Sequence, residues 1–479
     1  MIWRHLFGYL PASLAGGLAS FGAVFVYTRL MSAENYGFYA LALTTMSVVY
    51  TLSITWAEAA AFRFEPEASA KGALPSHVRT LLWLAAGSVL LALAAMLATL
   101  PFAGHPSMRM ALAAAAGAMI LAPLINVAQE LNRAQGRVAR YAAIRTFQDV
   151  GAFALGALLA WRTGFGPAAP FVGLASVLAV LAVIEGLRLV RASNRGQFDP
   201  ARVRPYLAYG VPVALALALN IALDTGDRFL IALFLGPEAV AVYAAGYGIA
   251  DKTIGLVCNL AAMAGAPLML AAWETKDAAA MEAASSNLAR LLLLIATPAA
   301  AGLALVAGPL AEVMIGESVR GTAAALIPWI AFSGLLNGFV LYYFSEAFLL
   351  SRRTDLRAGL MLIPALANLA LNIVLLPRIG LMGAVYSTVA CYGLALVLLA
   401  WVGRRLAPLS WPSADMVKIG ASCAAMAICV ALIPAWGGLA ELLAKSSAGA
   451  IAYVACVLAL DASGARTLLE GLRRRPARA

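Results

Sequence analysis

The sequence predicts an all-α, polytopic membrane protein with about fourteen transmembrane helices, and three observations predict it. Of the 479 residues, 63% are hydrophobic and only 12% are charged, whereas soluble proteins average about 25% charged residues. Apolar runs longer than about 18 residues recur along the chain, and they do not alternate between apolar and polar residues as barrel strands do. Basic residues, finally, are distributed unevenly among the loops.

Each predicted span is an apolar segment long enough to cross the hydrocarbon core of a bilayer as a helix. Gly236 and Pro237 separate the seventh span from the eighth. The seventh span is longer than the roughly 20 residues required, which allows it to tilt or bend. We predict the spans, in order, at residues 6–29, 37–60, 79–103, 109–130, 141–161, 168–190, 207–235, 239–270, 288–311, 323–349, 356–376, 380–402, 415–435 and 447–463.

The basic residues predict the orientation of these spans. With both termini in the cytoplasm, the cytoplasmic segments hold 26 of the 34 basic residues and the outer segments hold 6. This asymmetry is the positive-inside pattern of multipass membrane proteins. The other two basic residues, Arg228 and Lys252, lie inside spans. A net charge of +11 would favour nucleic acid as the partner of a soluble protein, but in these short loops it favours anionic membrane lipid, and we expect no nucleic-acid partner.

Several classes of function are disfavoured by what lies between the spans. No predicted outer loop exceeds about ten residues, so a separate folded domain has no room. A membrane glycan polymerase or ligase generally needs a sizeable outer loop, and we therefore expect no catalytic residues. The five cysteines all fall inside predicted spans and the three histidines are scattered. We expect neither a metal site nor a cofactor.

The chain also repeats itself. At a constant offset of 204 residues, Glu34 matches Glu238, Tyr39 matches Tyr243, and a following alanine matches as well. The repeat predicts two six-helix lobes, residues 1–200 and 201–405, followed by two extra helices and a basic tail at 406–479. Because each half contains an even number of spans, both halves have the same orientation, and we expect a binding site between them.

Charged residues inside apolar helices gather around the junction of spans seven and eight. Asp224, Asp227 and Arg228 lie in the seventh span, and Asp251 and Lys252 lie in the eighth. A charge at the centre of a bilayer costs about 2.5–3.5 kcal/mol on insertion scales, so such residues are candidates for a functional cavity. The alternative is that Asp224 and Arg228, four residues apart, form a structural ion pair.

Arg29, Arg228 and Lys252 are the candidates for binding an anionic substrate, because arginine and lysine are suited to phosphate oxygens. Arg29 has the alternative of lying at the outer membrane interface. Tyr243, Tyr247 and Asp251 share one helix face at a spacing of four, which suits stacking against sugars but is also common in packing.

Three further charged residues are candidates for coupling or charge pairing. Glu58 lies near the inner end of the second span. Arg145 and Asp149 lie four residues apart in the fifth span, so a structural ion pair is the alternative for them. The acidic candidates Asp224, Asp227 and Asp251 have two interpretations. They hold the basic side chains in place, or they carry a coupling proton or cation.

Three segments together resemble a known family. They are residues 29–43, the pattern from Asp227 and Arg228 through Gly236 and Pro237 to Tyr243, and residues 368–384. In this order they are similar to polysaccharide transporters, the Wzx-type flippases of the multidrug/oligosaccharidyl-lipid/polysaccharide (MOP) exporter superfamily. The resemblance covers spans 1–12 and fades over the last two.

The resemblance implies two six-helix lobes in a V shape, a cationic central cavity, and a location in the bacterial inner membrane. It implies a lipid-linked oligosaccharide as substrate, translocated by alternating access, with a polysaccharide polymerase or co-polymerase as a candidate partner. Basic residues are common in such flippases at the positions of Arg29 and Arg228.

Two other branches of the superfamily are less similar to this sequence. Drug exporters of the MATE branch usually carry a functional acid in the first helix, which is absent here. Peptidoglycan-precursor flippases are richer in basic residues along the first two helices, and the second span here has none before Arg63. A cation-coupled exporter of drugs or metabolites, with Asp224, Asp227 or Asp251 as its ion site, is the alternative function.

Overall fold

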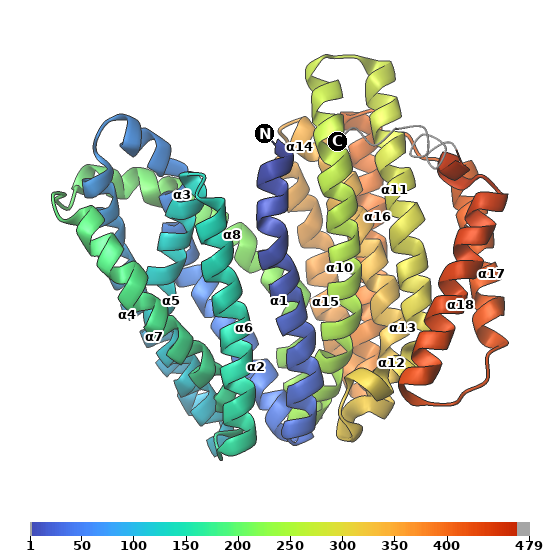
Figure 1. Cartoon of the computed structure of the whole chain (residues 1–479), viewed down its shortest axis with the longest axis horizontal. Helices are drawn as coiled ribbons and strands as arrows, with labels where there is room; N and C mark the ends of the chain where they lie inside the picture. The colour runs from blue at the N-terminus through green and yellow to red at the C-terminus, as the bar shows by residue number, and fades with distance from the viewer. Residues whose placement is uncertain (1, 467–479) are drawn as a thin grey trace, which may run out of the picture. The chain divides into compact units, whose positions relative to one another are not determined.

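The computed structural model describes residues 2–466, except for the side chains of residues 2–10, 222 and 223. Within these residues the chain is almost entirely α-helical and contains no β-strand (Figure 1). The prediction of an all-α membrane protein is thereby confirmed.

The first nine α-helices and two short 3₁₀ turns cover residues 2–235. They are α1 (Ile2–Leu30), α2 (Ala33–Ser53), α3 (Thr55–Ala70), α4 (Leu74–Thr99), η1 (Leu100–Phe102), α5 (Pro106–Ala134), α6 (Val138–Arg162), η2 (Gly166–Ala168), α7 (Ala169–Ser193), α8 (Pro200–Thr225) and α9 (Asp227–Leu235).

The remaining elements include a π-helical turn, η3, and a final 3₁₀ turn. They are α10 (Pro237–Glu274), α11 (Ala278–Leu305), α12 (Ala307–Met314), α13 (Glu317–Phe339), η3 (Val340–Phe344), α14 (Ser345–Leu350), α15 (Thr354–Ile379), α16 (Leu381–Leu406), α17 (Ser413–Ala431), α18 (Gly438–Ala459) and η4 (Ala462–Gly464).

The number of spans is close to the predicted one. Twelve helices in the described part of the chain are long and apolar enough to cross a membrane. The pair α2 and α3, bent by 47° at its break, would make a thirteenth span. The predicted seventh span, 207–235, is divided into α8 and α9 by a break at Gly226. Fourteen is therefore an approximate count.

Local sequence explains the helix boundaries that matter for the site. Ser32 caps α2, and its side chain accepts a hydrogen bond from the backbone N–H of Asn35, as N-cap serines do. At the end of α9, Gly236 adopts φ +87°, a conformation that glycine reaches without steric cost. Pro237 then occupies the first position of α10, where its missing N–H costs nothing.

The two copies of the repeated motif lie against each other. A Cβ atom added to Gly37 in α2 would lie 1.9 Å from the carbonyl oxygen of Pro237 in α10. The backbones of the two helix starts can approach this closely only because residue 37 is a glycine. The contact places the first turns of α2 beside those of α10.

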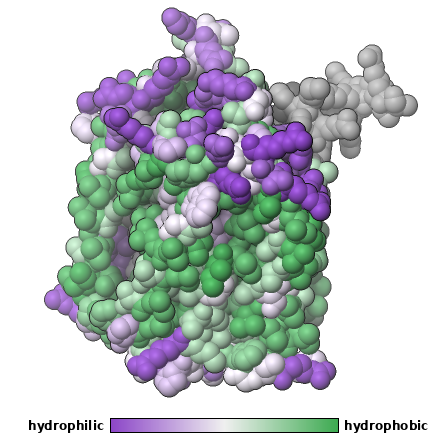
Figure 2. Space-filling view, turned by 90° about the vertical axis from the view of Figure 1, so that its left-hand side faces the viewer, coloured by the Kyte–Doolittle hydropathy of each residue, from purple (hydrophilic) through white to green (hydrophobic). Residues whose placement is uncertain are grey.

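The chain forms two compact units, Met1–Ala244 and Ala245–Ala479. The predicted lobes, residues 1–200, 201–405 and 406–479, stay a prediction. In the space-filling view, hydrophobic residues form a broad band between two hydrophilic rims (Figure 2), the distribution expected for a chain surrounded by lipid.

Candidate functional site

The junction of α9 and α10 holds a buried carboxylate. Asp227 is the first residue of α9 and is only 6% exposed. Tyr243 in α10, which is fully buried, donates a hydrogen bond from its hydroxyl to Asp227 Oδ2. The turn at Gly236 brings the two side chains together. The other carboxylate oxygen, Oδ1, is buried and has no hydrogen-bond partner among the described residues, so this site retains an unused acceptor.

Arg228 directs its guanidinium to α2. Its Nη1 donates a hydrogen bond to Thr44 Oγ1 at 3.2 Å, across 184 residues of sequence. Thr44 is 2% exposed, and its hydroxyl donates in turn to the carbonyl oxygen of Ala40 at 2.9 Å. Arg228 Nε is buried and has no hydrogen-bond partner in the described chain. We refer to Thr44, Asp227, Arg228 and Tyr243 as the Arg228 cluster.

A cavity of about 340 Å³ lies between α1, α2, α6 and α7 of the first unit. Arg145 and Asp149 form its charged wall, with Arg145 Nε 2.9 Å from Asp149 Oδ2. The predicted pairing of these two residues is thus present. Tyr27 and Tyr39 form an aromatic wall, and their ring centroids are 5.4 Å apart. We refer to this space as the α6 cavity.

Comparison with known proteins gives this site its context. The family described as polysaccharide biosynthesis protein matches residues 2–273, which is more than half of the chain. The chain belongs to the polysaccharide biosynthesis protein family. The matched region contains both the Arg228 cluster and the α6 cavity. The resemblance to polysaccharide transporters of the MOP superfamily is confirmed.

The fold of this chain is similar to that of solved structures. A structure of the lipid II flippase MurJ in an inward closed conformation is 12% identical, with a TM-score of 0.76, covering 96% of this chain and 99% of that one. An inward-facing multidrug resistance MATE transporter of the MOP superfamily is 16% identical, with a TM-score of 0.58, covering 82% and 93%. At these identities the likeness concerns the fold alone.

A curated relative adds little about function. An uncharacterised membrane protein of Methanocaldococcus jannaschii is 24% identical over 246 residues, which is 50% of this chain and 48% of the relative. This chain's match therefore spans about half the length of that relative.

Glu58 takes part in a separate set of side-chain hydrogen bonds. The hydroxyl of Tyr50 in α2 donates to Glu58 Oε1 in α3, and Asn126 Nδ2 in α5 donates to the Tyr50 oxygen at 2.5 Å. These bonds join three helices beside Ile54, where α2 and α3 separate. Neither Tyr50 nor Asn126 was predicted, because nothing in the sequence indicates that residues 76 positions apart meet.

Two further predicted site residues of the first unit lie outside both the Arg228 cluster and the α6 cavity. Arg29 is exposed, and its Nη1 donates to the carbonyl oxygen of Phe25 at 2.8 Å, with the guanidinium 4.0 Å from the Phe25 ring. Asp224 is exposed at the end of α8. Asp224 lies in the last turn of α8 and Arg228 in the first turn of α9, with Gly226 between the two helices. The pairing of Asp224 with Arg228 stays a prediction. The roles of Arg29 and Asp224 stay predictions.

Three other predicted residues belong to the second unit. Tyr247 is 6% exposed, and Lys252 is exposed. A Cβ atom added to Gly334 of α13 would lie 3.6 Å from Asp251 Oδ1, so Asp251 faces that helix. Their functional roles also stay predictions.

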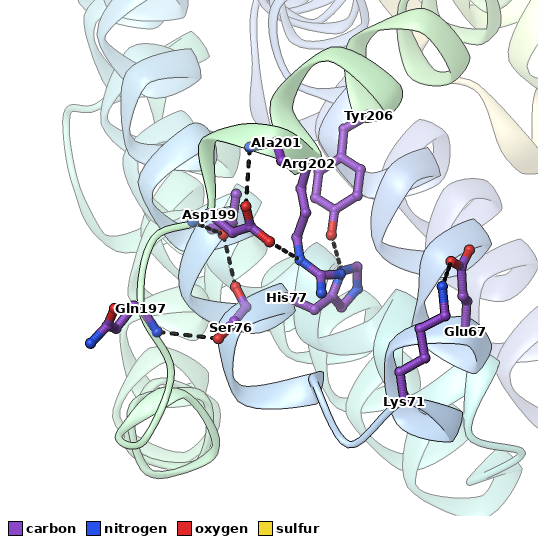
Figure 3. Close-up of polar contacts among 10 residues, drawn as sticks. Glu67, Lys71, Ser76, His77, Gln197, Asp199, Ala201, Arg202 and Tyr206 are labelled. Carbon is purple, nitrogen blue, oxygen red and sulfur yellow. Dashed lines mark hydrogen bonds and ion pairs between the residues drawn. The ribbon is translucent and has the colours of Figure 1, made fainter.

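A second polar cluster was missed by sequence reasoning. His77 in α4 is fully buried, and its Nδ1 is hydrogen-bonded to the hydroxyl of Tyr206 in α8, 129 residues away (Figure 3). The backbone N–H of Gln197 donates to Ser76 Oγ at 3.3 Å, and that of Asp199 donates to Thr80 Oγ1 at 3.0 Å. These contacts attach the segment before α8 to the start of α4, so this cluster fixes structure in the first unit.

Proposed function

We propose that this protein is a flippase that moves a polyprenyl-diphosphate-linked oligosaccharide from the inner to the outer leaflet of the membrane, for export of a surface polysaccharide. One observation carries the proposal: the match to the polysaccharide biosynthesis family covers the unit in which Arg228, partly buried, donates a hydrogen bond to Thr44 of another helix. No bond is made or broken in this process, so the protein needs no catalytic residue.

The charge chemistry of the Arg228 cluster supports a phosphate-bearing substrate. The guanidinium fork of arginine matches phosphate oxygens, and Arg228 Nε is a buried donor without a partner among the described residues. Asp227, held by Tyr243, stabilises the nearby cation when no substrate is bound. In this proposal Arg29 and Lys252 add positive charge along the path of the diphosphate, and the isoprenoid chain stays in lipid.

A cation-coupled exporter of drugs or metabolites is the second candidate function. The observation that favours it is the buried Oδ1 of Asp227, which has no hydrogen-bond partner among the described residues, because a buried carboxylate is a suitable carrier of a proton or cation. The two functions differ in their products: the first changes surface glycan, and the second changes resistance to small cationic compounds.

Deletion of the gene tests the proposal. We expect lipid-linked glycan to accumulate on the inner side of the membrane and surface polysaccharide to fall. Wild type restores export, whereas Arg228→Ala and Arg29→Ala, expressed at wild-type levels, restore it at least tenfold less well, the factor that about 1.4 kcal/mol of lost interaction produces.

Arg162→Ala is the matched control. Arg162 also ends a helix and also stacks on an aromatic ring of its own helix, 4.0 Å from the centroid of Trp161, and we expect full rescue. Unchanged glycan in the deletion strain, together with new sensitivity to cationic toxins, would overturn the flippase proposal in favour of the exporter.

A further inference from the structure

The α6 cavity exists because one face of α1 is built from small residues. Gly16, Ala19, Ser20 and Ala23 recur at the spacing of a helix face and line the cavity. A Cβ atom added to Gly16 would lie 2.9 Å from Asp149 Oδ2, whereas nothing lies within 4 Å of one added to Gly17. Residue 16 therefore decides how much space is left in front of the Asp149 carboxylate.

The charged wall of this cavity carries one positive and one negative side chain. Arg145 and Asp149 pair at 2.9 Å, and their side chains remain 46% and 18% exposed. A guanidinium offers five donors and a carboxylate several acceptor sites, so one bond between them leaves groups of both kinds for a ligand. Because the Arg145 guanidinium is paired with the Asp149 carboxylate, this wall offers a diphosphate no unpaired cation and a lipophilic cation no unpaired acid. A neutral ligand with many hydroxyl groups uses donors and acceptors together.

The aromatic wall supplies a rigid apolar surface opposite this pair. Tyr39 packs against Tyr27 with centroids 5.4 Å apart, and against Phe171 at 5.6 Å. The volume of about 340 Å³ is at the small end of the range of about 300–1,000 Å³ found for ligand pockets. The cavity accommodates one ring-sized group, and a pyranose ring has the required apolar C–H face and polar rim.

We propose that the α6 cavity binds one sugar ring of the transported lipid-linked glycan, with Arg145 and Asp149 hydrogen-bonded to its hydroxyl groups. The proposal rests on the proposed function and extends it. The Arg228 cluster recognises the diphosphate that all substrates share, and the α6 cavity recognises the sugar and so determines which glycan is accepted.

A competition assay on the full-length protein in nanodiscs tests this inference. The bound probe is a fluorescent analogue of undecaprenyl diphosphate. The competitors are unlabelled undecaprenyl diphosphate and the lipid-linked glycan extracted from the deletion strain. For wild type we expect the glycan lipid to compete about tenfold better than the bare diphosphate, equivalent to about 1.4 kcal/mol.

The variants separate the two subsites. In Gly16→Val and Asp149→Asn we expect the tenfold preference for the glycan lipid to disappear while affinity for the bare diphosphate stays unchanged. In Arg228→Ala we expect both competitors to weaken alike. Gly17→Val is the control and keeps the wild-type preference. Monodisperse elution of each variant establishes that it is folded.

The possible failures point to different conclusions. If wild type binds neither diphosphate lipid, the proposed function is wrong. If wild type binds both lipids equally, or if Gly16→Val and Asp149→Asn both keep the preference, the diphosphate site stands and the sugar subsite is wrong.

Discussion

At the scale of the residue, the site depends on how buried charges are satisfied. Asp227 and Arg228 are neighbours in sequence, yet their side chains bond to different helices, Asp227 to Tyr243 of α10 and Arg228 to Thr44 of α2. A buried polar group without a partner costs about 1–3 kcal/mol, and more if it is charged. The two bonds therefore connect α9 to α10 and to α2, and they fix the direction of the guanidinium.

Removing the Tyr243 hydroxyl tests this account. We expect Tyr243→Phe to lower the midpoint of thermal unfolding in detergent, because Asp227 loses a hydrogen bond worth about 1.5–3 kcal/mol when the acceptor is charged. Asp227→Asn should lower the unfolding midpoint much less in the Tyr243→Phe background than in the wild type, since both changes remove the same interaction. Tyr209→Phe, at a 40% exposed tyrosine, is the control. Additive effects of the two changes would show that the bond is energetically unimportant.

At the scale of the element, close backbone contacts position the helices that carry these residues. The start of α2 fits against the start of α10 at Gly37, and this contact holds Thr44 two turns further along α2. Glycine is unfavourable in a helix interior by about 0.5–1 kcal/mol. Position 37 nevertheless requires it, because a larger side chain would collide with the backbone of Pro237, which cannot move aside as a side chain can.

A pair of glycine substitutions distinguishes packing from helix propensity. Gly37→Ala places a methyl group 1.9 Å from the Pro237 carbonyl oxygen, so we expect a loss of folded, monodisperse protein in fluorescence-detected size-exclusion chromatography. Gly87→Ala in α4 meets nothing within 4 Å, and we expect an equal or higher unfolding midpoint. Equal behaviour of the two variants would contradict the close contact of α2 and α10.

At the scale of the whole molecule, hydrophobic composition and basic loops specify how the chain lies in a membrane. On the face drawn in Figure 2, two hydrophilic rims border the apolar band. The twelve apolar helices of the described chain require a multipass protein. The orientation of the chain in the membrane stays a prediction from the positive-inside pattern.

Cysteine labelling tests that orientation. In a variant with the five native cysteines replaced, we expect Gly164→Cys, in the loop after α6, to react with a membrane-impermeant maleimide in intact cells. Arg195→Cys, in the basic segment after α7, should react only in inverted vesicles. Both positions are exposed, so accessibility within the protein does not distinguish them. The reverse pattern would place the termini outside.

The sequence by itself determined the class of protein, the approximate number of spans, the repeated motif and the resemblance to polysaccharide transporters. It also identified Asp227, Arg228 and Tyr243 as candidates, and the pair of Arg145 with Asp149. These features were predictable because they depend on local properties: the length of an apolar run, a charge placed inside it, and residues one helical turn apart.

Only the tertiary structure decided which of the polar residues meet. Thr44 and Arg228 are 184 residues apart, and the α6 cavity is assembled from four helices. The break at Gly226, which separates Asp224 from Arg228, was also not evident in an apolar run that reads as one helix. Contacts of this kind depend on how helix faces distant in sequence pack together, and periodicity within one helix carries no information about its neighbours.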